Sequence, residues 1–126
     1  MRYIVPVVLF LVGLIHILPL AGVLGGARLH ALYGIAVSEP NLEILLRHRA
    51  VLFGLLGLFL CIAAFRPAHQ AAALLAGLAS VASFLFLAAA VGGYNAHLAR
   101  VFAVDVAALV LLVLAGGVFL YAKGRA

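Results

Sequence analysis

Residues 101–121 read VFAVDVAALVLLVLAGGVFLY, a stretch with a single charged residue, Asp105. At a rise of about 1.5 Å per residue, a helix of this length crosses a hydrocarbon core of ~30 Å. A single apolar segment in lipid satisfies its own backbone polar groups only as a helix. The stretch therefore predicts a transmembrane helix.

Composition extends this prediction to the whole chain, which is 69% hydrophobic and 9% charged with a mean hydropathy of +1.37. Soluble domains are nearer to about 45–50% apolar and 25% charged. Four apolar stretches are separated by turn-forming residues and predict spans at about 3–24, 46–65, 71–91 and 101–121. The first run is long enough to favour an uncleaved span over a signal peptide. We expect an all-α fold, a transmembrane four-helix bundle forming one integral membrane domain over residues 1–126, with the lipid bilayer around it.

The connection between the first two spans carries its own helical signals. Leu29, Leu32 and Tyr33 at helical spacing predict a short interfacial helix on the bilayer surface. Ser38, with Pro40 just after it, predicts the N-cap of a second helix that begins above the membrane.

Tyrosines and basic residues bear on topology. The four tyrosines all fall at or just outside span ends, as an interfacial belt predicts: Tyr3, Tyr33, Tyr94 and Tyr121. The net charge of +5 comes from scattered basic residues that suit lipid head groups, so we expect no nucleic-acid partner. Four basic residues fall at each face, and the acidic residues beside one group favour cytoplasmic termini in an inner membrane.

Small residues form a helical seam on the second span. The seam runs from Arg47 through small residues at spacings of three and four: Ala50, Gly54, Gly57, Cys61 and Ala64. Such seams mark close helix packing in membranes. Arg47 is thus expected to point along the packing surface, whereas Arg49, about 200° around the helix, is expected to reach the head groups. The third span has a similar stripe, which predicts packing there too: Ala72, Ala76, Ala79, Ser83 and Ala90.

Ionisable residues gather in one half of the predicted bundle. Asp105 is the one acidic residue within a span, and Arg47 lies at nearly the same depth, so the two are expected to pair. The candidate ligand-binding residues are therefore Arg47, His48, Asp105, His16 and Asn95, and Asn95 also suits the cap of the last helix. The alternative interpretation of Arg47 with Asp105 is a structural ion pair that holds two helices together.

Cofactor and enzymatic chemistry find less support. His16 and His48 are separated by about a helical turn in depth, which disfavours a haem held between them, and no tight ligand cluster predicts a metal. The sequence has no phosphate-binding glycine loop, nucleophile elbow or serine triad. These patterns favour a protein that is not an enzyme and has no cofactor, with haem or quinone left as alternatives.

Residues 32–57 carry a family resemblance. Leu32-Tyr33-Gly34-Ile35, Pro40-Asn41, and Leu46-Arg47-His48-Arg49-Ala50 leading into Gly54-Leu55-Leu56-Gly57 resemble the DoxX-like family of small four-helix bacterial membrane proteins. The match covers the first two spans, over residues 1–65, and beyond them only the hydrophobic pattern. The resemblance implies a four-helix bundle in a bacterial cytoplasmic membrane, with some relatives linked to quinone-dependent redox enzymes.

Three functions are consistent with these features. The first is an accessory or scaffolding subunit, present as a homo-oligomer or within a larger membrane complex, as the small-residue seams suggest. The second is binding or transport of a small anion, lipid or quinone at the polar site in one leaflet. The third is a haem or redox role.

Overall fold

The described part of the chain is helical. A computed structural model describes residues 2–19, 30–31, 33–34 and 39–125. Its helices are α1 (Ile4–Ile17), α3 (Pro40–Ala64), α4 (Gln70–Val91) and α5 (Ala96–Arg125), with a 3-10 turn at Pro67–His69 before α4. Among these described helices, three are long and apolar enough to cross a membrane, and α1 is a shorter apolar helix. The prediction of an all-helical chain with four apolar helices is confirmed.

The helix ends differ from the predicted spans. At 14 residues, α1 is about 21 Å long, and the predicted end of the first span at Leu24 lies outside the described residues. The helix α3 begins well before the predicted span, at Pro40, and its N-cap is Glu39, whose carboxylate accepts hydrogen bonds from the backbone of Asn41 and Leu42. The cap was predicted at Ser38, which is not among the described residues.

Most of the predicted interfacial helix also lies outside the described residues. In that region His30, Ala31 and Tyr33 are helical, and the Gly34 N–H donates to the His30 carbonyl at 2.7 Å. Gly34 has a φ of +67°, a conformation that suits glycine. A Cβ at this position would lie 2.5 Å from His97 Nδ1, so this turn closely approaches the start of α5.

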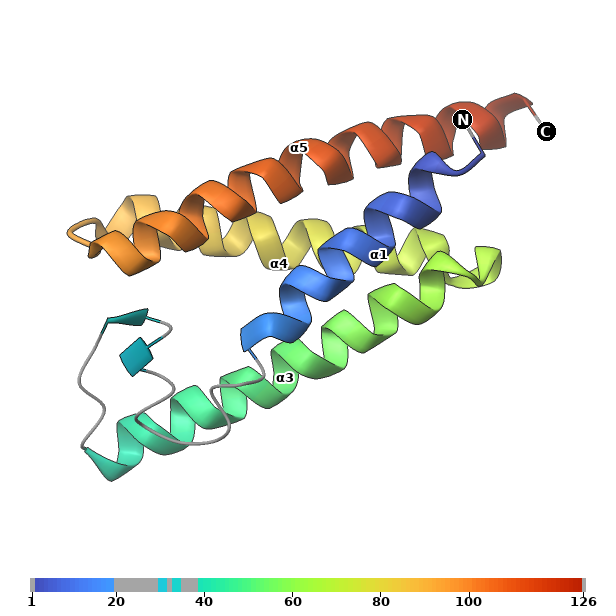
Figure 1. Cartoon of the computed structure of the whole chain (residues 1–126). Coiled ribbons are helices and arrows are strands. Elements are labelled where there is room, and N and C mark those ends of the chain that lie inside the picture. The colour runs from blue at the N-terminus through green and yellow to red at the C-terminus, as the bar shows by residue number, and fades with distance from the viewer. Residues whose placement is uncertain (1, 20–29, 32, 35–38, 126) are drawn as a thin grey trace.

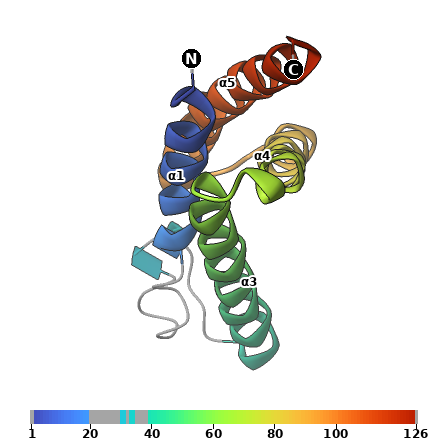
Figure 2. The same cartoon turned by 90° about the vertical axis from the view of Figure 1, so that its right-hand side faces the viewer.

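The helices run alternately up and down, and both termini lie at the same end (Figure 1). The α4–α5 connection and the turn around Tyr33 lie at the opposite end (Figure 1). Seen from the end where the termini lie, α1 is next to α3, and α4 is next to α5 (Figure 2). Toward the end opposite the termini, α3 diverges from α4 and α5 (Figure 1).

The core lies where the four helices meet. Each helix contributes at least one fully buried large side chain: Leu9 and Val12 from α1, Leu60 from α3, Val81 from α4 and Leu112 from α5. Large apolar side chains elsewhere on all four helices are exposed, for example Leu11, Leu55, Leu75 and Leu114. The core is thus a narrow central contact, and the outer surface is apolar.

The predicted seam on α3 is confirmed as the surface that receives α1. A Cβ at Gly57 would lie 2.6 Å from the Gly13 carbonyl oxygen, and a Cβ at Gly13 would lie 2.6 Å from Cys61 Sγ. Ala50, Gly54, Gly57 and Ala64 on this face are buried. Glycine lets the two backbones approach this closely because it has no side chain at the crossing.

The predicted packing stripe on α4 is not the face that packs within the described chain. Ala72, Ala79, Ser83 and Ala90 are exposed, and Ala76 is half-buried. The face that packs is the one that holds Ala73, Leu74, Gly77 and Val81. Both faces of α4 are apolar and rich in small residues, so the sequence pattern did not distinguish the packing face from the outer one.

Candidate ligand-binding site

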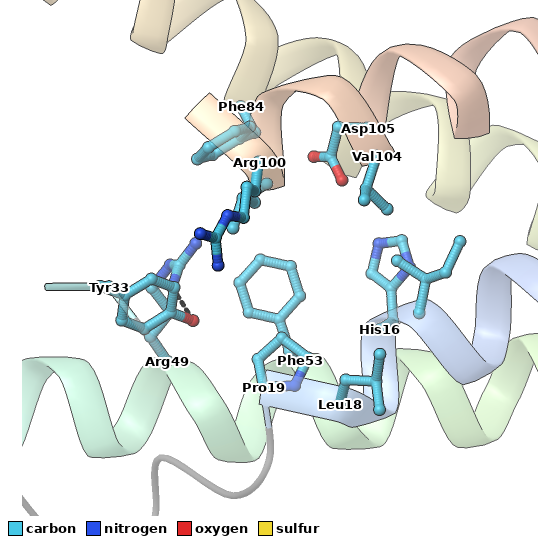
Figure 3. A pocket seen from close by; sticks show the side chains of 12 residues that line it. His16, Leu18, Pro19, Tyr33, Arg49, Phe53, Phe84, Arg100, Val104 and Asp105 are labelled. Atoms are coloured by element: carbon cyan, nitrogen blue, oxygen red, sulfur yellow. Dashed lines mark hydrogen bonds between the residues drawn. The ribbon is translucent and has the colours of Figure 1, made fainter. Parts of the chain in front are cut away.

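A cavity of about 210 Å³ lies toward the end of the bundle that is opposite the termini. Its walls come from the end of α1, the middle of α3, the first turns of α5, one residue of α4 and Tyr33 (Figure 3). Leu18, Arg100 and Val104 are exposed, so the cavity can be reached from outside. The lining residues are Ile15, His16, Leu18, Pro19, Tyr33, Arg49, Phe53, Phe84, Arg100, Val101, Val104 and Asp105.

His16 is buried in the wall of this cavity, with hydrogen bonds at both ring nitrogens. Nδ1 lies 2.9 Å from the Val12 carbonyl oxygen, and Nε2 lies 2.9 Å from Ser80 Oγ on α4. A carbonyl can only accept, so Nδ1 carries the proton, and in the neutral ring Nε2 accepts the Ser80 hydroxyl proton. His16 therefore joins α1 to α4 and presents its ring to the cavity without a free nitrogen. Ser83, one turn later, donates to the Ser80 carbonyl instead.

Arg49 enters the cavity from α3 and is held by aromatic side chains. Its Nη1 donates to the Tyr33 hydroxyl at 3.0 Å. Its guanidinium carbon lies 4.5 Å from the centroid of Phe53 and 5.4 Å from that of Tyr33. Cation–π contacts of this kind strengthen where water is excluded. The guanidinium is therefore positioned in advance, at the side of the cavity where Tyr33 is buried.

The helix α5 contributes both Arg100 and Asp105. In the view of Figure 3, the Arg100 side chain extends to the side of the cavity where Arg49 and Tyr33 lie, and the Asp105 carboxylate lies nearer to His16. Asp105 is half-buried and lines the same cavity as Arg49. Among the described residues, however, Asp105 has no ion-pair partner within 4.0 Å. The cavity therefore holds two guanidinium groups and one carboxylate that stands apart from them.

Asn95 positions this end of the bundle without lining the cavity. Its Oδ1 accepts a hydrogen bond from the Leu98 N–H at 2.9 Å, which caps α5 as predicted. Its Nδ2 donates to the carbonyls of Tyr33 at 2.7 Å and Gly34 at 3.3 Å. One side chain thus fixes the start of α5 to the turn that carries Tyr33.

The predicted site residues are only partly brought together. His16 and Asp105 line the cavity, and Asn95 donates a hydrogen bond to the backbone of Tyr33, which lines it. Within the described residues, Arg47 lies beside Glu43, at 3.7 Å, rather than beside Asp105, and the guanidinium at the cavity is that of Arg49. The expected pairing of Arg47 with Asp105 is therefore not found among the described residues, and the arginines that share the cavity with Asp105 are Arg49 and Arg100.

His48 is exposed on α3, whereas His16 is buried, so the two histidines considered as haem ligands do not share the cavity. The residues that the sequence reasoning missed are Arg49, Arg100, Tyr33 and Phe53. One signal was present in the sequence: Arg49 and Phe53 are one helical turn apart and continue at helical spacing to Leu60, which is fully buried. A charged residue at the end of a buried apolar face points into the bundle.

A second hollow, of about 440 Å³, lies where α1 begins and α5 ends, and its lining includes Arg2, Gln70 and Lys123. Arg2 and Lys123 are exposed, as is typical of basic residues that flank membrane spans. In the first cavity Arg49 and Asp105 are half-buried and carry opposite charges, and it is therefore the candidate site.

The fold and the cavity define a class: an all-helical protein with three helices long and apolar enough to cross a membrane and a charged cavity between diverging helices. Comparison with protein-family models, curated proteins and solved structures finds no match for this chain.

Proposed function

We propose that this protein is embedded in a membrane and binds an amphipathic ligand through an anionic head group in the cavity around Arg49 and Arg100. The observation that carries the proposal is the presence of two arginines in one partly buried cavity whose other walls are mostly apolar. Extensive exposed apolar surface on every described helix supports the membrane setting.

The charges of the cavity favour an anion. Arg49 and Arg100 contribute two positive charges and Asp105 one negative charge, which leaves a net charge of +1 with neutral His16. Guanidinium groups present several donors in a fixed plane and bind phosphate or carboxylate oxygens in pairs. Two guanidinium groups at one side of a cavity repel each other, and a bound anion relieves that repulsion.

The size of the cavity limits what it can hold. Sites that enclose a whole drug-sized ligand have volumes of about 300–1,000 Å³, and this cavity has about 210 Å³. A head group fits, and the apolar remainder of the ligand would lie outside it. The exposed apolar rim formed by Leu18 and Val104 suits such a chain. A lipid or a related amphiphile therefore fits the cavity better than a large soluble substrate.

The setting that we propose is a bacterial cytoplasmic membrane, as the DoxX-like resemblance implies, with both termini in the cytoplasm. Since the termini and the cavity lie at opposite ends of the helices, the cavity would then open into the outer leaflet of that membrane.

Binding of defined lipids to the purified protein tests this function. Native mass spectrometry with phosphatidylglycerol would compare the wild-type chain with Arg49→Gln, Arg100→Gln and the control Arg47→Gln, which removes a cation from the same helix outside the cavity. Loss of a charged hydrogen bond predicts binding that is about tenfold or more weaker for the two cavity variants. Equal binding by all four proteins would refute the proposal.

A second candidate function is that of an accessory or scaffolding subunit, as a homo-oligomer or in a larger complex. The small-residue stripe of α4 supports it, because this stripe is exposed in the single chain and such stripes form helix contacts in membranes. Ala79→Phe would then shift the purified protein in mild detergent from an oligomer to a monomer. A wild-type protein that is monomeric and carries no partner would count against this candidate.

A further inference from the structure

The cavity presents an acceptor that the anion-binding function leaves unused. Asp105 is half-buried in it, and none of the described residues forms an ion pair with this carboxylate. Arg49, a cation of the same cavity, donates a hydrogen bond to Tyr33 and stacks over Phe53. A carboxylate in apolar surroundings is costly unless it is paired or hydrogen-bonded. A cationic donor from the ligand would supply that partner.

We infer that the ligand's head group is zwitterionic: a phosphate bound by Arg49 and Arg100, and a primary ammonium group bound by Asp105. This inference rests on the proposed function and narrows its ligand class to lipids that carry an amine on their phosphate.

The geometry supports a short linker between the two charges. Arg100 and Asp105 lie on the same helix, separated by about 7.5 Å along its axis at the usual rise per residue, and both face one cavity of about 210 Å³ (Figure 3). A phosphate and an amine fit into this volume together only when few atoms separate them. A two-carbon linker, as in an ethanolamine phosphate, meets this limit.

The Asp105 carboxylate favours a compact cation with several N–H donors. An unmethylated ammonium has three N–H donors for carboxylate oxygens, whereas a trimethylated one has none and is bulkier. Tyr33 and Phe53 stack against the Arg49 guanidinium, so these two rings are already engaged by a cation and are not free to form the aromatic cage that suits a quaternary ammonium group. The primary amine is therefore the cation that the site favours.

The net charge of the cavity by itself predicts the opposite lipid preference, so the experiment can distinguish a specific amine contact from simple charge attraction. A cavity of net charge +1 attracts anionic phosphatidylglycerol more strongly than neutral phosphatidylethanolamine. A preference for phosphatidylethanolamine thus requires a specific contact with its amine, since the phosphate is common to both lipids.

The experiment measures the affinity of the full-length protein in detergent for short-chain phosphatidylethanolamine, phosphatidylcholine and phosphatidylglycerol, and repeats it with Asp105→Asn. The wild-type protein is expected to bind phosphatidylethanolamine about tenfold more tightly than the other two. Asp105→Asn, which keeps the shape of the side chain, is expected to abolish this preference while it retains or strengthens binding of phosphatidylglycerol.

The outcomes separate this inference from the proposed function. If the wild-type protein binds phosphatidylglycerol as tightly as phosphatidylethanolamine, the zwitterionic head group is refuted, whether or not the Asp105→Asn variant folds. The proposed anion site is not refuted by that result. No binding of any of the three lipids overturns both. Water-soluble phosphoethanolamine, added as a competitor, should displace the lipid only weakly, because it lacks the apolar chains. Equal potency of this compound would overturn the assignment to a lipid.

Discussion

The contact between α1 and α3 gives the sharpest prediction about stability. Gly57→Ala would place a methyl group 2.6 Å from the Gly13 carbonyl oxygen and 2.9 Å from the Ile17 backbone nitrogen. The shorter approach is about 0.8 Å below the 3.4 Å at which ordinary van der Waals contact begins. Both neighbours belong to the backbone of α1, so the helix as a whole must move.

The size of the effect follows from this displacement. A radial gap of 0.5–1 Å forfeits roughly a quarter to a half of the dispersion energy of the contacts it opens, and overpacking of a close contact typically costs about 1–3 kcal/mol. We expect this packing cost to make Gly57→Ala about 1–3 kcal/mol less stable than a Gly→Ala substitution at an uncrowded helix position. Gly116→Ala on α5 is the matched control, because a Cβ there has no described neighbour within 4 Å.

The two substitutions gain the same helix propensity, up to about 1 kcal/mol, so the difference between them isolates the packing term. Equilibrium unfolding in mixed dodecyl maltoside and sodium dodecyl sulfate micelles, followed by circular dichroism, measures both. The control should be as stable as the wild type or more stable. If Gly57→Ala is as stable as Gly116→Ala, the close backbone approach is incorrect.

Three further predictions address helix linkage, capping and topology. A double-mutant cycle of His16→Phe with Ser80→Ala should give a coupling of about 0.6–1.7 kcal/mol in micelle unfolding, and strictly additive effects would exclude the hydrogen bond. Asn95→Ala should cost about 0.5–2 kcal/mol, whereas Asn95→Ser, which can still cap α5, should recover part of it; equal losses would argue against the cap. With Cys61→Ser as background, Gly124→Cys should react with a membrane-impermeant maleimide only after the cells are permeabilised, and labelling of intact cells would place the termini outside.

Much of the fold could be predicted from local sequence. Spans at 46–65, 71–91 and 101–121 are helical throughout the predicted ranges, apart from the last residue of the first, because apolar runs of this length have one backbone solution in lipid. The cap at Asn95 was predictable for a similar reason, since it depends on a hydrogen bond that spans three residues. Close packing along Gly57 was also visible, because small residues recur there at helical spacing.

The candidate site could be predicted from the sequence only in part. Asp105 and His16 stood out as ionisable residues inside spans, and both line the cavity. The choice of Arg47 over Arg49 failed because the small-residue seam continues only to where α1 lies against α3, and beyond it the helices diverge. The partner of Arg49 is Tyr33, which comes from a connection whose position no periodicity predicts.

The sequence by itself determined which segments are helices and that their outer surface is apolar, since both depend on hydrophobicity and on hydrogen bonds between near neighbours. Only the tertiary structure decided which face of each helix is buried. On α4, for example, every face is apolar, so hydrophobicity does not choose between Gly77 and Ala79. That choice depends on contacts between residues distant in sequence, such as the hydrogen bond that the Ser80 hydroxyl donates to His16, 64 positions earlier. The cavity lies toward the end of the bundle where α3 diverges from α4 and α5, beyond the contacts that hold the four helices together.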